Sequence, residues 1–317
     1  MASVPTVSVI VPAFNAEAFV GQAIGSILAQ TFDDFELVVV DDGSTDRTAE
    51  VLSSIGDDRL HVRTLGTNSG LAAARNLGLA ASRGKYIAWL DSDDSSSPSR
   101  LGRQVRLLEA NPTVGVCGTW VRTFGDVPSR VWRYPRTAAY IRAHMLFDDP
   151  VATSSVMIRR DALEGSSVAF EASFAPAEDY DCWERISRSW GVVNIPRILT
   201  RYRIHGAQTS TRDAAEQRHA IERIQLRQLC ALGLRPSEID WRMQFAVGVD
   251  WGQGIGAEML SRADSWLDQI TDANAVSHVY SRESLAAVVA QRRRIVRNQV
   301  RPSPARSISM RLHTLSH

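Results

Sequence analysis

The chain has almost no lysine and few cysteines. Lys85 is the only lysine among 36 basic Lys and Arg residues, so a mechanism that needs a catalytic lysine elsewhere in the chain is excluded. Cys117, Cys182 and Cys230 are widely spaced, odd in number, and set in apolar or helical contexts. We therefore expect three buried structural thiols rather than a disulfide framework, a metal cluster or a nucleophile.

Long apolar runs and a strong net charge are also absent. No run approaches the roughly 20 apolar residues that span a bilayer, and the first residues, Met1–Pro5, lack the regions of a signal peptide. We therefore expect a cytoplasmic protein. The formal net charge is +1 over 317 residues, and no base-stacking motif accompanies the arginines, so nucleic acid is not an expected partner.

The first 90 residues alternate between β-branched runs and segments of helical period. Buried strands are expected at Val7–Val11 and Phe35–Val40, and further strands at Leu60–Leu65 and Tyr86–Leu90. Helices are expected at Glu17–Gln30 and Leu71–Ser82, with a further helix capped by Ser44 or Thr45. This alternation predicts an α/β domain with a mostly parallel sheet and helices on both faces.

The pattern loosens after residue 112. Strands are expected at Val114–Phe124 and Ser154–Ile158, a helix at Asp179–Trp190, an apolar segment at Val192–Leu199, and helices at Ala214–Leu232, Ala257–Ile270 and Arg282–Val300. We expect one domain over residues 1–210 and a helical extension over 211–317 that ends in a basic tail.

Polar side chains follow three of the expected strands. They are Pro12-Ala13-Phe14-Asn15, Asp41-Asp42-Gly43-Ser44 and Asp91-Ser92-Asp93. Ligands of open α/β sheets bind at the carboxyl ends of the strands, and crowded carboxylates repel each other unless a cation lies among them. Asp91 and Asp93 are spaced to grip Mg²⁺ or Mn²⁺ while the cation holds a diphosphate. An isolated D-x-D also suits a turn, but its place after the fourth strand favours the metal interpretation.

These clusters belong to a longer series of motifs. The series runs through Val7–Asn15, Phe35–Asp46, Asn68–Asn76, Tyr86–Asp94, Ala177–Trp183 and Tyr202–His205. Over roughly residues 4–210 the chain resembles the inverting, non-processive family-2 glycosyltransferases of GT-A fold. Phe14 stands where that family often has tyrosine, a change that keeps the ring face.

The resemblance implies metal-dependent transfer of a sugar from a nucleotide-diphosphate sugar of the UDP, dTDP or GDP type. Residues 1–112 would bind the donor and residues 113–210 would face the acceptor, for which a cell-envelope or lipid-linked glycan is one class. Pro12 to Asn15 would wall the site of the nucleobase, with Phe14 against its ring and Asp42 accepting a hydrogen bond from its N–H edge. Arg75 would meet the diphosphate.

The resemblance also assigns the metal site. Asp91, with Ser92 beside it, would hold the ribose or a metal-bound water, and Asp93 would ligate the cation. His205 would be a third metal ligand, a phosphate donor or only a structural histidine. Turn capping by Asp42 and a surface position for Arg75 are the alternative interpretations of those two residues.

Asp179 stands where the family motif has its general base. A carboxylate at a helix N-terminus is favoured in its ionised form, and such a base contributes about 10²–10⁴ in rate. Glu178 and Asp181 could orient or replace it, and a simple acidic helix cap is the alternative. A single displacement implies inversion at the anomeric carbon.

The last helix leaves two interpretations open. No acid follows Glu283, while seven arginines and several apolar residues do. Such a helix could make a peripheral contact with the inner face of the plasma membrane, or it could pack on the catalytic domain. The segment Gln291–Ile295 is similar to the Q-x-x-R-W motif of processive synthases, but isoleucine replaces its tryptophan, which argues against a processive enzyme.

Two other functions share parts of this pattern. A sugar-nucleotide pyrophosphorylase would need a glycine-rich N-terminal loop with a lysine, and Lys85 is misplaced for that role. A non-catalytic nucleotide-sugar-binding protein would not need both Asp93 and Asp179.

Overall fold

The computed structural model describes residues 4–165, 169–206, 213–250 and 256–300. The chain divides into two compact units, residues 1–136 with 151–208, and residues 137–150 with 209–317. The division near residue 208 lies close to the expected boundary. Residues 137–150 differ from that expectation, because they belong to the helical unit. The basic tail expected over residues 301–317 lies outside the described residues.

The first unit carries the strands and the shorter helices. Its elements are β1 (Val7–Ala13), α1 (Val20–Leu28), β2 (Phe35–Asp41), α2 (Thr48–Ser53), β3 (Leu60–Thr64), α3 (Leu71–Ala81), β4 (Tyr86–Trp89), β5 (Ser95–Ser96), α4 (Arg100–Ala110), β6 (Val114–Gly125), β7 (Val131–Trp132), the 3-10 helix η1 (Thr153–Ser155), β8 (Met157–Arg159), α6 (Arg160–Gly165), η2 (Ala172–Phe174), α7 (Glu178–Ser187) and β9 (Gly191–Ile204).

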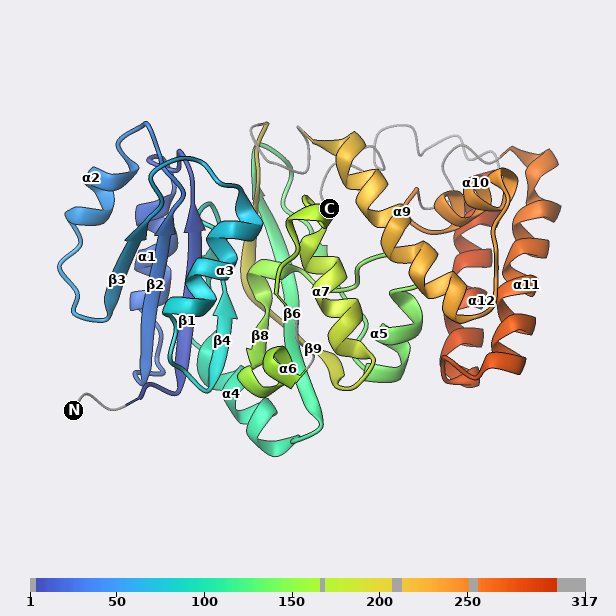
Figure 1. The fold of residues 1–317 in the computed structure, drawn as a ribbon, viewed down its shortest axis with the longest axis horizontal. Coiled ribbons are helices and arrows are strands. Elements are labelled where there is room, and N and C mark those ends of the chain that lie inside the picture. Colours follow the sequence, from blue (N-terminus) through green and yellow to red (C-terminus); the bar gives the residue numbers. More distant parts are fainter. Residues whose placement is uncertain (1–3, 166–168, 207–212, 251–255, 301–317) are drawn as a thin grey trace. The chain divides into compact units, whose positions relative to one another are not determined.

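The strands form one sheet in the order β3-β2-β1-β4-β8-β6-β9-β5, with β7 paired to β6. The strands β3, β2, β1 and β4 are parallel and lie side by side (Figure 1). Beyond them β8 runs antiparallel to both β4 and β6, while β6 and β9 are parallel. The expected α/β sheet is confirmed, and the three strands that end in the polar clusters, β1, β2 and β4, are neighbours in its parallel part.

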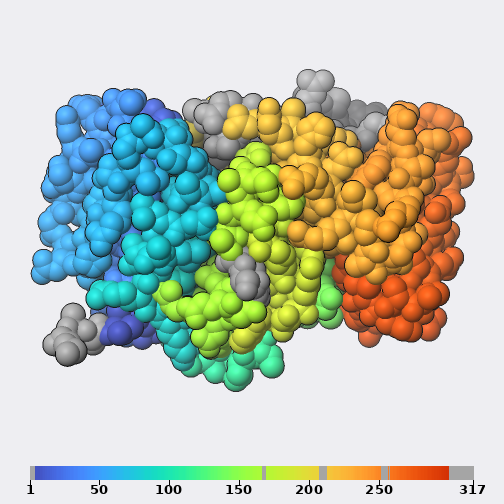
Figure 2. All heavy atoms as spheres, viewed as in Figure 1, coloured from blue at the N-terminus to red at the C-terminus, as the bar shows by residue number. Residues whose placement is uncertain are grey.

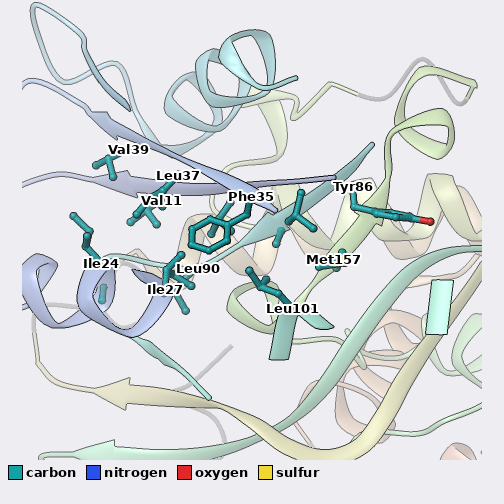
Figure 3. Close-up of a cluster of buried hydrophobic side chains, with 14 of the residues drawn as sticks. Val11, Ile24, Ile27, Phe35, Leu37, Val39, Tyr86, Leu90, Leu101 and Met157 are labelled. Carbon is teal, nitrogen blue, oxygen red and sulfur yellow. The ribbon is translucent and has the colours of Figure 1, made fainter. Parts of the chain in front are cut away.

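Strand β1 is buried over its whole length because helices cover both faces of the sheet. Alternate side chains of a strand point to opposite faces. Val7, Val9 and Val11 join the core that α1 covers, whereas Ile10 on the other face meets Gly78 of α3. Figure 3 shows part of this core, where Ile24 and Ile27 lie beside the strands. Each large aliphatic side chain buried here stabilises the fold by about 1.5–3 kcal/mol.

The second unit is helical. It consists of α5 (Ala138–His144), α9 (Ala214–Ala231), α10 (Glu238–Val247), η3 (Ala257–Met259), α11 (Leu260–Ser277) and α12 (Arg282–Val300). Three buried glutamines join α5 to this unit: Gln228, Gln244 and Gln225 donate to the consecutive carbonyls of residues 145, 146 and 147 at distances of 2.7–3.0 Å. Each buried carbonyl thereby gains the partner it needs, which explains why residues 137–150 belong here.

Helix α12 is packed within this unit. Its apolar side chains Leu285, Val288, Val289 and Val296 are buried in the core. Arg293 and Arg297 bond Asp264 or Asp268 of α11, and Arg292 is fully buried against His144 and the carbonyl of Gly248. Of the two interpretations of this helix, the buried side chains support packing, here within the helical unit, and a peripheral membrane contact stays a prediction. Within the described ranges, no helix has the length and apolar character that crossing a membrane requires.

Three local expectations differ from the structure. Thr153–Ser155 forms a 3-10 helix, so the strand expected from Ser154 begins only at Met157. The helix expected after Ser44 or Thr45 begins at Thr48, because Ser44 and Asp46 hydrogen-bond the backbone of residues 15 and 17 instead. Helix α4 was not expected.

The cysteines match the prediction in two of three positions. Cys117 and Cys182 are buried free thiols, whereas Cys230 is half-buried and accepts a hydrogen bond from Arg235. Burial raises the pKa of Cys117 to about 12. A thiol in that state is a poor nucleophile, which agrees with a structural role.

Two helical glycines test the packing of α3 on the sheet. A Cβ at Gly78 would lie 2.3 Å from Cγ2 of Ile10, whereas a Cβ at Gly25 of α1 would meet nothing within 4 Å. We expect Gly78→Ala to destabilise the protein by about 1–3 kcal/mol through overpacking. The control Gly25→Ala should be neutral or stabilise it by up to about 1 kcal/mol through helix propensity. Urea unfolding midpoints compare the two, and a tolerated Gly78→Ala would contradict the close contact.

Candidate active site

The ends of β1 and β2 meet as expected. The amide of Asp42 donates to the carbonyl of Ala13 at 2.8 Å, so Pro12, Ala13 and Asp42 lie at one edge of the sheet. The side chain of Phe14, just beyond β1, is 40% exposed. A ring in this position can offer its face to a planar ligand.

The carboxylate of Asp42 already organises the neighbouring loop. Its two oxygens accept hydrogen bonds from the amides of Ser69 and Gly70, both at 2.8 Å. A carboxylate can accept about four hydrogen bonds, so Asp42 combines this local role with capacity for one more donor. Asn15 acts in the same region, where its side-chain oxygen accepts from the amide of Thr45 at 2.8 Å.

Three carboxylates crowd the loop after β4. Asp91 and Asp93 are half-buried with Ser92 between them, and Asp94 is 1% exposed. Burial, together with repulsion from Asp93 and Asp91, raises the pKa of Asp94 well above its usual value. Burial also raises the pKa of Asp91, with Asp93 adding to the effect and Arg75 opposing it. Burial and mutual repulsion therefore both oppose ionisation of the carboxyl groups of Asp91 and Asp94.

The end of β9 closes against this loop. The amide of Arg203 donates to Oδ1 of Asp94 at 2.7 Å, and its Nε donates to the carbonyl of Asp93 at 2.9 Å. Nε2 of His205 lies 2.9 Å from Oδ2 of Asp93. Residues more than 100 positions apart in the sequence thus meet, and a metal-binding role for His205 stays a prediction.

The donor atoms here suit a divalent cation in kind. Asp91 and Asp93 supply carboxylate oxygens and His205 supplies an imidazole nitrogen, and the buried Oδ2 of Asp94 has no hydrogen-bond partner within the described part of the chain. In the same part of the chain, no three acidic, His or Cys side chains are already arranged as a metal-ligand set. Asp93 and His205 are brought together, whereas Oδ2 of Asp91 is bonded to Ser154 at 2.8 Å.

Arg75 occupies the centre of a second cluster. It is 3% exposed, its Nη1 donates to Oε1 of Glu178 at 2.7 Å, and its Nη2 lies 3.7 Å from Oδ1 of Asp91. Burial alone would lower the pKa of Arg75, but Glu178, Asp179 and Asp91 raise it above its usual value. Arg75 thus links α3 with α7, which Figure 2 shows as adjacent cyan and yellow-green surfaces. It is not the surface arginine of the alternative interpretation, and its contact with a diphosphate stays a prediction.

Two hydroxyls of η1 join the carboxylates. Ser154 Oγ donates to Oδ2 of Asp91 at 2.8 Å and accepts from the amide of Asp91 at 2.9 Å. Thr153 Oγ1 donates to Oδ2 of Asp179 at 2.5 Å. Neither residue was predicted as part of the site, although three consecutive hydroxyl side chains, Thr153 to Ser155, before an apolar strand are a signal for them.

The comparisons with known proteins agree with this geometry. Residues 8–165 match the family model described as glycosyl transferase family 2. An uncharacterised glycosyltransferase of Haemophilus influenzae is 33% identical over 236 residues, which are 71% of this chain and 73% of the relative. The chain therefore belongs to glycosyl transferase family 2, and it is a transferase enzyme. This membership decides against the pyrophosphorylase alternative.

More distant matches extend the likeness. The Escherichia coli enzyme named UDP-Glc:alpha-D-GlcNAc-diphosphoundecaprenol beta-1,3-glucosyltransferase WfaP is 29% identical over 64% of this chain and 79% of its own length. Staphylococcus aureus TarS, solved with UDP-GlcNAc, has a TM-score of 0.59 and 19% identity, covering 93% of this chain and 91% of that one. The mannosyltransferase PcManGT of Pyrobaculum calidifontis, solved with GDP-Man and Mn²⁺, has a TM-score of 0.54 and 16% identity, covering 92% and 87%. The two structures support the GT-A fold.

The ion pair between Arg75 and Glu178 can be tested by stability. Arg75→Gln leaves the carboxylate of Glu178, which is 1% exposed, without its cation. Breaking one partner of a buried pair destabilises a protein by about 3–5 kcal/mol. We expect the double variant Arg75→Gln with Glu178→Gln to recover part of that loss, because it removes the unpaired charge of Glu178 and leaves only the half-buried Asp91 and Asp179 without the cation. Urea unfolding of the single and double variants measures the difference, and equal midpoints would contradict the pairing.

Proposed function

We propose that this enzyme transfers a sugar from a nucleotide-diphosphate sugar to an acceptor hydroxyl in a single displacement that inverts the anomeric carbon. One observation carries the proposal. Asp91 of the β4 loop and Asp179 of α7 are bonded to adjacent residues of η1, and both influence the same buried Arg75. Asp91, which would serve the donor, and Asp179, which would serve the acceptor, therefore lie around the same turn and the same arginine.

The donor would bind across the ends of β1, β2 and β4. Phe14 offers a partly exposed ring to the nucleobase, and Asp42 retains capacity for its N–H edge. Asn15 holds the loop around residue 45 beside that position. Arg75 and Ser92 lie toward the phosphates and ribose in this arrangement, where the guanidinium of Arg75 would act together with Asp91 rather than from the surface.

Mn²⁺ or Mg²⁺ would be held by Asp93, with His205 and Asp91 beside it. The cation would neutralise charge on the leaving diphosphate. The raised pKa values of Asp91 and Asp94 support the proposal, because a bound cation would reduce the repulsion between these carboxylates. The related fold of PcManGT was solved with Mn²⁺. Asp94 and Arg203 would keep the loop and β9 in register around the ion.

Asp179 would take the proton of the acceptor hydroxyl. It is half-buried and lies in the first turn of α7. The amide of Tyr180 and the hydroxyl of Thr153 each donate to one of its oxygens, at 2.8 and 2.5 Å, which fixes the plane of the carboxylate. Glu178 is bound to Arg75 and is therefore a positioning group rather than a second base.

The names of relatives and of a structural neighbour support particular classes of donor and acceptor. WfaP is named for UDP-Glc and a diphosphoundecaprenol-linked acceptor, and another relative, 33% identical over 56% of this chain, is the succinoglycan biosynthesis protein ExoO of Rhizobium meliloti. TarS was solved with UDP-GlcNAc. These names support a UDP-sugar donor as the first choice and a lipid-linked or cell-envelope glycan as the acceptor.

Asp179→Asn tests the base. The amide keeps the size of the side chain but cannot take a proton, so we expect turnover of the donor to fall by about 10²–10⁴ while donor affinity is unchanged. The measurement is release of nucleoside diphosphate from UDP-Glc, UDP-GlcNAc, dTDP-Glc and GDP-Man with Mn²⁺. Asp161→Asn, in the first turn of α6, removes the same charge at another helix start and should keep activity. Equal turnover in wild type and Asp179→Asn would reject this assignment.

Asp93→Ala tests the metal site. Ligands that bind the native state raise its melting temperature, so UDP, dTDP or GDP with Mn²⁺ should raise the Tm of the wild type more than either component alone. We expect Asp93→Ala to lose the additional rise because its carboxylate would ligate the cation. The exposed Asp126→Ala is the control for charge removal. A metal-dependent shift of wild-type size in Asp93→Ala would place the cation elsewhere.

A further inference from the structure

The η1 turn is buried although each of its residues carries a hydroxyl. Thr153 is 8% exposed, and Ser154 and Ser155 are 0% exposed. Three buried hydroxyls in sequence have to be matched by hydrogen-bond partners. Each hydroxyl finds a different one: Thr153 bonds Asp179, Ser154 bonds Asp91, and Ser155 bonds the backbone of residues 119 and 152.

Hydrogen bonds of Ser155 also fix the turn to β6 and α4. Ser155 Oγ accepts from the amide of Thr119 on β6 at 3.1 Å, and the buried Gln104 of α4 donates to the carbonyl of Ser155 at 2.8 Å. Gln104 in turn accepts from the buried Arg100 at 3.0 Å. A turn held in this way has little freedom to move, so the hydroxyls of Thr153 and Ser154 are presented in fixed positions.

The two hydroxyls act on groups from separate elements. Ser154 Oγ makes two hydrogen bonds with Asp91, because it donates to the carboxylate and accepts from the backbone amide, so it sets both the position and the orientation of that residue. Thr153 bonds Asp179 at the start of α7, which lies 88 residues further along the chain than Asp91. Because residues 153 and 154 are covalently adjacent, the spacing of the two carboxylates is tied to one peptide unit.

We propose that η1 is the positioning element of the active site, in which Thr153 aligns Asp179 toward the acceptor hydroxyl and Ser154 aligns Asp91 toward the donor. This inference rests on the proposed function. Neither hydroxyl acts as a base or a nucleophile. Their contribution is geometric, since misplacement of a reacting group by about 1 Å lowers the rate by about 100-fold.

The two positions should affect different kinetic constants. Thr153→Val keeps the shape of the side chain and removes the hydroxyl, so kcat for donor hydrolysis should fall by about 10–100-fold with donor KM unchanged. Thr153→Ser returns a hydroxyl and should recover kcat to within about threefold of the wild type. Ser154→Ala loosens Asp91 and should raise donor KM by about 10-fold, the effect of losing roughly one hydrogen bond to a charged group.

Ser155→Ala is the matched control in the same turn. Its hydroxyl bonds the backbone of residues 119 and 152 rather than a carboxylate, so this change should lower Tm without separating kcat from KM in the way that Thr153→Val does. The assay is nucleoside diphosphate release from the donors named above, with Mn²⁺, on the full chain, alongside Tm for every variant.

The outcomes separate this inference from the function on which it rests. Wild type without turnover of any donor would reject the proposed function and the role of η1 with it. Wild-type turnover together with an unimpaired Thr153→Val, or a Thr153→Ser variant as slow as Thr153→Val, would overturn the role of η1 and leave the proposed function standing. A low kcat in Thr153→Val, unchanged KM and Tm, and rescue by Thr153→Ser would support it.

Discussion

The active site depends on one buried cation. Arg75 is almost fully enclosed, bonds Glu178 directly, and lies near Asp91 and Asp179. Burying carboxylates at this spacing without a positive charge would be strongly unfavourable, because desolvation and mutual repulsion both oppose their ionised forms. The guanidinium makes the arrangement possible, and it also ties α3 to α7, so elements from the two ends of the first unit's sequence share one electrostatic centre.

In the β4 loop, the guanidinium of Arg75 interacts with Asp91, the first of the three aspartates. Burial raises the pKa values of Asp94 and of Tyr202 well above their usual ranges, and the neighbouring carboxylates add to both effects. Nε2 of His205 contacts the carboxylate of Asp93, and this imidazole is charged only when protonated, whereas the guanidinium of Arg203 bonds the backbone carbonyl of Asp93. The protein therefore gathers carboxylates in the β4 loop, where the proposed reaction needs a divalent cation.

The helical unit obeys a different constraint. Its core is apolar around Trp266 and Leu267, and its buried polar groups satisfy one another: Trp266 donates to Gln244, which donates to Gln225 and to the carbonyl of Leu146. Such a network stabilises a unit only if it is complete. The carbonyls of residues 145–147 need these glutamine partners, which explains why residues 137–150 belong to the helical unit although its other helices follow more than 60 residues later.

The sequence alone determined the fold of the first unit and most of its functional candidates. Periodicity located β1, β2, β6 and α3 closely, and the motifs identified Asp42, Asp91, Asp93 and Asp179 as candidates. Both succeed because strand burial and turn conformation depend on residues that are neighbours in the sequence. Only the tertiary structure decided which groups meet. The pairing of Arg75 with Glu178, the hydroxyls of Thr153 and Ser154 beside two distant carboxylates, and the burial of the arginine-rich α12 all depend on contacts between elements far apart in the chain. No local pattern encodes such contacts, because they are fixed by the packing of the folded protein.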